Sequence, residues 1–157
     1  MCRWPRNKTL KCLSVSQPFA DLIVSNKKTI ELRRWNTHFR GEFLVHAPQK
    51  IRTQDCRRLK MSIDLVTGAI VGKAELYDVK KYSSAGEVKK DQRCHFASKD
   101  YKAGYGFLLK NAKALRVPIP CMGRLGFFEV ELGKISKDEI KTDIVDEEYR
   151  YQWINCH

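Results

Sequence analysis

The segment from Leu13 to Trp35, LSVSQPFADLIVSNKKTIELRRW, constrains the fold most, because it predicts a strand, a short helix and a second strand in close succession. Apolar and polar residues alternate over 13–16, as they do in a strand that is buried on one face. Pro18 fits the opening turn of a helix, where its missing N–H costs no hydrogen bond. Asn26 can adopt the left-handed conformation that ends many helices, so the helix is expected to start near residue 17 and to stop by Asn26.

The second strand of this segment, expected over 29–35, has two chemically different faces, because successive side chains of a strand point to opposite sides. One face is largely apolar. Lys28 lies at the turn before the strand, close enough to Glu31 and Arg33 for a shared concave site. The same charges would also suit a solvated strand face, where ordinary ion pairs contribute little. The polar face carries Thr29, Glu31, Arg33 and Trp35.

The charge of the chain favours a polyanionic partner. Over 157 residues, 30 Lys and Arg stand against 18 Asp and Glu, a net charge of +12. From Asp138 onward six acids and two bases give −4, so residues 1–137 hold 28 bases and 12 acids, or +16. A field of one sign attracts nucleic acid, although it could equally serve solubility.

The sequence also predicts a cellular setting. No run approaches the about 18 apolar residues of a membrane span, and the first ten residues lack the apolar core of a signal peptide. We therefore expect a cytoplasmic protein, or a nuclear one if the source is eukaryotic, without membrane association. The six cysteines are scattered, so reduced thiols are expected. A zinc site would need distant ligands, such as Cys94 and His95 with others, and we expect no metal and no cofactor.

The remaining strands are expected at 42–47, 68–82, 105–109, 114–121 and 125–132. The first of these should form a hairpin with 29–35, which would bring His46 beside the charged junction. Gly72 lies inside the long strand and predicts a bulge or a close backbone approach. The two prolines of 114–121 exclude this segment from a central position in a sheet.

Between the strands we expect short helices. A basic helix opened by Pro48 is predicted over 48–61, with Arg57 and Arg58 on a surface that suits phosphate contacts or simply solvent. A polar excursion over 83–101 should contain a helical turn or two. The fold class is therefore α+β, a small mixed β-barrel of five or six strands with short flanking helices. Residues 1–9 form a basic arm, and residues 135–157 form a helical extension packed on the domain, with helices around 137–141 and 147–154.

These segments resemble the ASCH domain family of the PUA-like superfamily, which are compact β-barrels associated with RNA. The resemblance rests on the opening segment and then, in the family's order, on RGEFLVHA, GAIVGKAEL, YGFLLKN and PIPCMGRLGFFEV. It implies an ASCH domain over 10–134. Asn26 stands where a glycine is usual in the family, and asparagine keeps the required backbone geometry.

The resemblance implies that Lys28, Glu31 and Arg33 line a cleft. Some small ASCH relatives are amidohydrolases that deacetylate N4-acetylcytidine with a lysine, a threonine three residues later and a more distant glutamate. The lysine corresponds to Lys28, but Glu31 occupies the threonine position, and Thr29 is out of register. Other relatives have been associated with RNA cleavage.

Two functional hypotheses follow from these observations. The first is a binding module for RNA or single-stranded nucleic acid, including a modified nucleoside, in which arginines contact phosphate, Glu31 accepts a hydrogen bond from a base, and an aromatic ring stacks on that base. The second is a metal-independent amidohydrolase or ribonuclease in which Lys28 is base or nucleophile and Glu31 moves a proton. The predicted binding residues are Lys27, Lys28, Glu31, Arg33, Arg34, Trp35, His46, Arg57, Arg58 and Tyr105, with Phe107 expected in the core.

Overall fold

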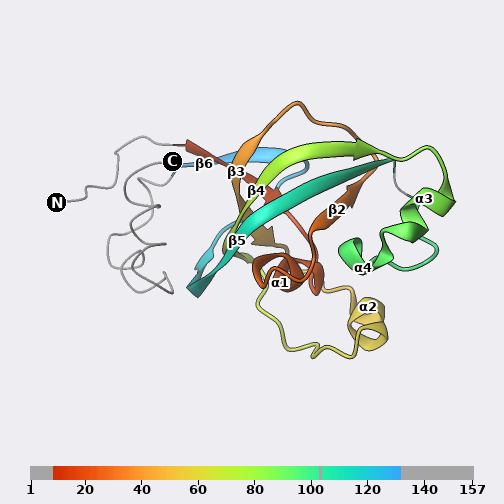
Figure 1. The fold of residues 1–157 in the computed structure, drawn as a ribbon. Coiled ribbons are helices and arrows are strands. Elements are labelled where there is room, and N and C mark those ends of the chain that lie inside the picture. Colours follow the sequence, from red (N-terminus) through yellow and green to blue (C-terminus); the bar gives the residue numbers. More distant parts are fainter. Residues whose placement is uncertain (1–8, 103, 132–157) are drawn as a thin grey trace.

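The computed structural model describes residues 9–102 and 104–131, which form a six-stranded mixed sheet with short helices packed on it (Figure 1). The strand order is β2-β5-β4-β3-β1-β6, in which β1 and β3 are parallel and the other neighbours are antiparallel. The strands are β1 (Thr9–Ser14), β2 (Ile30–Arg33), β3 (Gly41–Ala47), β4 (Ala69–Lys81), β5 (Tyr105–Pro120) and β6 (Phe127–Glu131). The helices are α1 (Phe19–Val24), α2 (Thr53–Arg58), α3 (Ala85–Lys90) and α4 (Gln92–His95).

The α+β class is confirmed, but the predicted barrel is wrong. Strands β2 and β6 are the two edges of the sheet and do not pair with each other, so the sheet stays open. A barrel requires every strand to be hydrogen-bonded on both sides. Alternating residues predict the buried face of each strand, but they do not reveal whether the outermost strands meet.

The predicted hairpin between the second and third strands is also wrong. Strand β2 pairs with β5, in a register that places Ile30 opposite Leu108. Strand β3 instead lies between β4 and β1. Strands that are neighbours in a sequence often pair, but here β2 pairs with a strand that comes much later in the chain.

Helix α1 is held by the residues on either side of it. Five of its six residues are buried against β3, β4 and β5. The buried Gln17 side chain, which precedes the helix, accepts a hydrogen bond from Asp21 N at 3.0 Å and so satisfies one backbone N–H of the first turn. Asn26 has the predicted positive φ, 62°, and its amide Nδ2 donates to Ala112 O at 2.9 Å. The turn after α1 is thereby fixed to β5.

The bulge that Gly72 predicts is confirmed, because the register between β4 and β5 shifts between Ile70 and Gly72. A Cβ at residue 72 would lie 2.2 Å from the backbone oxygen of Lys113 and 2.6 Å from Val24 Cγ1. Only glycine allows the strands and α1 to approach this closely. The bend contributes to the curvature of the two long strands in Figure 1.

The basic helix predicted over 48–61 is shorter than expected, since α2 covers only Thr53–Arg58 and Lys60 has a left-handed φ of 55°.

The excursion over 83–101 contains α3 and α4, as predicted, and packs on β2 through a small core of Ile30, Leu32, Tyr82, Val88 and Ala97. Pro118 and Pro120 lie in the second half of β5, which pairs with β4 but not with β2. This half of β5 is therefore an edge of the sheet. Among the described residues, no helix is long and apolar enough to span a membrane. Of the predicted arm over 1–9, Thr9 belongs to β1 and residues 1–8 lie outside the described residues, as does the predicted extension over 135–157.

Candidate nucleic-acid pocket

A small pocket of about 130 Å³ lies at the carboxyl end of β1. Its walls come from β1, β2, the start of α2 and the segment that follows α4. We call it the Glu31 pocket. Its charged lining residues are Lys28, Glu31, Arg33, Arg52 and Asp55, and Phe19 and Tyr101 supply aromatic surface.

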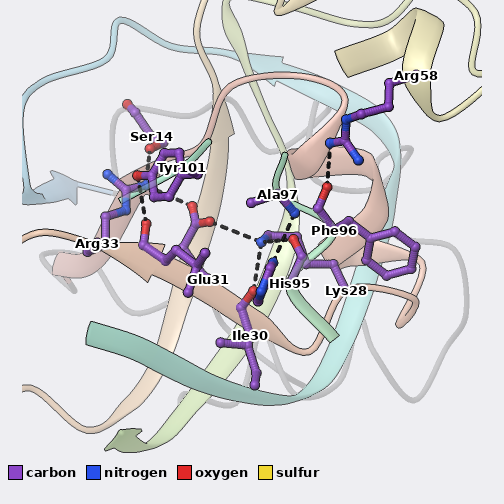
Figure 2. A network of polar contacts seen from close by, with 11 residues as sticks. Ser14, Lys28, Ile30, Glu31, Arg33, Arg58, His95, Phe96, Ala97 and Tyr101 are labelled. Atoms are coloured by element: carbon purple, nitrogen blue, oxygen red, sulfur yellow. Dashed lines mark hydrogen bonds and ion pairs between the residues drawn. The ribbon is translucent and has the colours of Figure 1, made fainter. Parts of the chain in front are cut away.

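Lys28 forms the buried base of this pocket, with 2% of its surface exposed. Its Nζ donates to Ile30 O and to His95 O, both at 2.6 Å, and lies 3.2 Å from Glu31 Oε1, as Figure 2 shows. Three acceptors match the three donors of an ammonium group, whereas a neutral amine has two. Burial lowers the pKa of Lys28, and the Glu31 carboxylate opposes that shift. The contacts are those of a charged lysine.

Glu31 lies between two cations. Its Oε1 faces Lys28, and its Oε2 accepts a hydrogen bond from Arg33 Nη2 at 3.0 Å. Burial alone would raise the pKa of Glu31, but the charges of Lys28 and Arg33 outweigh this and hold the pKa below its ordinary range. The pocket therefore contains a carboxylate that stays ionised although it is largely buried.

Arg33 connects β2 to β1. Its Nη2 also donates to Ser14 O at 2.7 Å, and its Cζ lies 5.9 Å from the ring centroid of Trp35. The guanidinium is thereby fixed beside Glu31 through Nη2, while its buried Nε–H makes no hydrogen bond with the described residues.

The segment that follows α4 forms one wall of the pocket, and a neutral histidine, His95, holds this segment in place. The Nδ1 of His95 accepts a hydrogen bond from Ala97 N at 3.0 Å, so the proton resides on Nε2, which donates to Val88 O at 2.7 Å. Burial lowers the pKa of His95, consistent with this neutral state. The carbonyl of the same residue accepts from Lys28. His95 thus positions Lys28 through its backbone.

Tyr101 and α2 complete the wall. The Tyr101 hydroxyl donates to Leu32 O at 3.3 Å, and burial raises the pKa of this tyrosine, so the phenol is neutral. Arg58 binds Asp55 at 2.8 Å and donates to Phe96 O, a contact visible in Figure 2. Helix α2 is therefore tied to the segment that carries Tyr101.

Comparison with known proteins assigns the fold to a family. The ASCH domain model matches residues 13–119, well over half of the chain. The chain belongs to the ASCH domain family. The ASCH protein of Zymomonas mobilis is similar in structure, with a TM-score of 0.56 and 18% identity over 84% of this chain and 91% of that one. A tyrosine-to-phenylalanine mutant of that protein gives 0.57 and 17%, over 78% and 91%.

A serine-to-alanine mutant of the same Zymomonas protein matches with a TM-score of 0.56 and 17% identity, over 78% of this chain and 89% of that one. No curated protein gives a significant match. At these identities the structural neighbours show the fold alone, and they are consistent with a PUA-like fold.

Within this ASCH domain, three of the predicted site residues meet as expected, namely Lys28, Glu31 and Arg33. His46 lies on the other side of Ser14 and does not line the Glu31 pocket. The basic side chains of Lys27, Arg34, Arg57 and Arg58 are exposed around the domain. Trp35 and Tyr105 are half-buried and pack on the main core, and Phe107 is fully buried, as expected.

Several residues of the pocket were not predicted from the sequence. Tyr101 and Ser98 belong to the excursion over 83–101, and no local sequence pattern indicates where that excursion packs. Ser14 fits the alternation of a strand and carries no other signal. Arg52 and Asp55 lie three residues apart and form an ion pair at 2.8 Å, a spacing that could have drawn attention to the start of α2. Among the described residues, no group of His, Cys, Asp and Glu is arranged to hold a metal ion.

Proposed function

We propose that this ASCH domain binds RNA or single-stranded nucleic acid and takes one base into the Glu31 pocket. The observation that carries the proposal is the Glu31 carboxylate, which Lys28 and Arg33 keep ionised beside a cavity. A fixed carboxylate accepts hydrogen bonds from the amino and imino groups on the edge of a base, as Asp and Glu do for the amino group of cytosine. The Glu31 carboxylate itself disfavours a phosphate next to it, so we place the base rather than the phosphate against Glu31.

The size and lining of the pocket suit one planar ring. A cavity of about 150 Å³ accommodates benzene, and the Glu31 pocket has about 130 Å³. Phe19 and Tyr101 line it, and stacking of a base on an aromatic ring contributes about 1–3 kcal/mol. The ring that stacks on the base is therefore proposed to be Tyr101 or Phe19.

Cations at the rim would hold the backbone of the nucleic acid. Arg52 lines the pocket with 47% of its side chain exposed, and Arg34 is exposed directly after β2, the strand that carries Glu31. Their charge adds to a chain of net charge +12. Contacts of this kind position a strand without reading its sequence and weaken with salt.

A hydrolase that uses the same pocket is the second candidate. The favouring observation is a buried lysine, with its pKa lowered by burial, 3.2 Å from a carboxylate. One observation opposes a hydrolase: all three N–H donors of Lys28 contact two carbonyls and Glu31. Lys28 must therefore break one of these contacts to act as a base or nucleophile. The substrates to test are N4-acetylcytidine and RNA.

The decisive experiment is a fluorescence-anisotropy titration of a short labelled mixed-sequence RNA with wild type, Glu31→Gln and Glu42→Gln. Glu42 is a matched control, because it also pairs with a lysine, Lys73 at 2.7 Å, but lies outside the pocket. Both variants remove one negative charge, so attraction between the protein and RNA alone would strengthen both. A hydrogen bond from a base to Glu31 predicts instead that only Glu31→Gln weakens binding, by about tenfold.

Equal affinities for the two variants would contradict the proposal. The hydrolase candidate is tested by mass spectrometry of N4-acetylcytidine and the RNA after incubation with the protein. A product that forms with wild type and is absent with Lys28→Ala, under conditions in which circular dichroism shows that the variant is folded, would establish catalysis. Intact substrates together with binding sensitive to Glu31→Gln would establish a binding module.

A further inference from the structure

A second depression lies directly beside the Glu31 pocket, and we call it the Cys121 groove. It has a volume of about 830 Å³, several times that of the pocket, and is open to solvent. The two cavities share Ser14 and Ser16 as a common wall. The far side of the groove is formed by residues 120–125, which connect β5 to β6.

The shared wall is rigid because a hydrogen-bonded histidine supports it. His46 Nε2 donates to Cys121 O at 2.7 Å, so its Nδ1 is the acceptor for the Ser14 hydroxyl at 2.9 Å. Cys121 N in turn donates to Gly68 O at 3.1 Å. These bonds fix the loop to β1 and β3 without any ligand, so the groove is formed in advance.

Gly123 brings the loop into direct contact with this wall. A Cβ at residue 123 would lie 2.7 Å from both Ser14 Oγ and His46 Cε1. Any larger residue would push the loop away or break the bond between Ser14 and His46. The close approach sets the width of the groove where it meets the Glu31 pocket.

The charge of the groove suits a phosphate. Among the described residues that line it there is no Asp or Glu, and Arg124 is exposed on the loop. The Glu31 pocket, by contrast, contains two carboxylates. A strand that places a base against Glu31 would therefore meet Arg124 across Ser14, as the arginine of the groove that the adjoining phosphate contacts.

The loop also offers apolar surface for a second base. Met122 is 89% exposed and lines the groove together with Pro120. A methionine sulfur makes favourable contacts with aromatic rings. Leu125, which also lines the groove, is fully exposed.

We propose that the Cys121 groove holds the nucleotide adjacent to the one whose base occupies the Glu31 pocket. The domain would then recognise a step of two nucleotides, with the first base at Glu31, the linking phosphate at Arg124 and the second base against Met122. This inference rests on the proposed function, and it adds the minimum length of the ligand and the second site.

The test is an NMR titration of ¹⁵N-labelled full-length protein with uncharged ribonucleosides and then with mixed-sequence ribodinucleotides. Nucleosides should shift the amide signals of Ser98 and Tyr101 alone. Dinucleotides should shift these signals and also those of Gly123 and Arg124, and should bind about tenfold more tightly. The dinucleotide affinity should fall as salt is added, because salt screens the attraction between Arg124 and the phosphate, whereas the affinity for an uncharged nucleoside should show no such slope.

A double variant provides the matched comparison. Met122→Ala with Arg124→Ala should reduce dinucleotide affinity to that of a nucleoside and remove the salt slope. Arg116→Ala with Val117→Ala deletes the same kinds of side chain from exposed positions of β5 that line neither cavity, and should bind like wild type. Equal dinucleotide affinity in the two double variants would overturn the inference.

The outcomes separate the inference from the proposed function. Nucleosides that bind at Tyr101, with dinucleotides that never reach Gly123, would leave the proposed function intact and refute the second site. A lack of shifts at Ser98 and Tyr101 with either ligand would refute both. Concentration-dependent shifts at Met122 and Leu125 without ligand would assign the groove to a second copy of the chain.

Discussion

Lys28 Nζ and Glu31 Oε1 lie 3.2 Å apart, in side chains that are only 1% and 9% exposed. Burial of two such charges is costly, and their attraction offsets the cost only when each also has good hydrogen bonds. The two carbonyls at Lys28 and the guanidinium of Arg33 at Glu31 supply those bonds. The pair therefore tolerates burial as long as it stays complete.

Removal of Lys28 should destabilise the fold strongly. Lys28→Ala leaves two carbonyls without their donor and a buried carboxylate with one cation, so we expect a loss of about 3–5 kcal/mol in the free energy of unfolding. Lys27→Ala, at the exposed neighbouring position, should change it by less than about 0.5 kcal/mol. Urea denaturation of both variants, followed by tryptophan fluorescence, measures the difference. Equal stability of the two would mean that the pair is not buried in solution.

The contribution of Glu31 should disappear in acid. Its pKa is held below the ordinary range by Lys28 and Arg33, so the folded state binds fewer protons than the unfolded chain, whose glutamates titrate near about 4.3. The advantage of wild type over Glu31→Gln in unfolding free energy should be fully present above about pH 5 and shrink as the pH falls below the unfolded value. Glu129→Gln removes an exposed partner of Lys11 and should cost less than about 1 kcal/mol. A constant difference between wild type and Glu31→Gln down to acid pH would contradict the assignment.

Two buried histidines should make the fold sensitive to mild acid. His46 and His95 are each 1% exposed, and burial lowers the pKa of both. Below about pH 6.5 the unfolded chain gains protons that the folded state resists, so stability should fall by up to about 1.4 kcal/mol per pH unit for each histidine. Urea denaturation between about pH 7.5 and about pH 5 tests this. His46→Asn should reduce the slope, and a slope equal to that of wild type would contradict the role of this histidine.

Two glycines should respond to alanine in opposite directions. Gly72→Ala would place a methyl group 2.2 Å from the backbone oxygen of Lys113, and we expect a loss of about 3 kcal/mol or more in unfolding free energy. Gly86 lies in α3 with its nearest outside atom, Ser84 Oγ, at 3.7 Å. Gly86→Ala should therefore stabilise the protein by about 0.4–1 kcal/mol. A tolerated Gly72→Ala would show that β4 and β5 are less closely packed than described.

The meeting of Lys28, Glu31 and Arg33 could be predicted because it is local. A turn followed by a strand places alternate residues on one face, and the three lie within six positions of each other. The donors and walls around them could not be predicted in this way. The carbonyl of His95 and the ring of Tyr101 arrive from an excursion that packs on β2 through Tyr82 and Val88. No pattern in the sequence of that excursion indicates the surface on which it packs.

The aromatic residues show the same division between local and tertiary information. Trp35 lies next to the charged strand, which made it a candidate to stack on a base, but its ring packs edge-on against Phe107 and Phe127, with centroids at 5.2 and 5.9 Å. Phe127 belongs to β6, far along the chain. A residue's neighbours in the core depend on strand order, and the open sheet and the pairing of β2 with β5 were the features that local patterns did not reveal.

The pairing of β2 with β5 has a consequence for the synthesis of the protein. The ribosome makes Lys28, Glu31 and Arg33 long before it reaches β5, which begins at Tyr105. Until β5 and the carbonyl of His95 are made, β2 lacks its hydrogen-bonding partner and Lys28 lacks one of its acceptors. The nascent chain therefore carries Lys28, Glu31 and Arg33 before the pocket around them exists. A chaperone or ribosome-bound factor would meet these charges as a solvated, unpaired segment, and the site itself would appear late, when the fold is nearly complete.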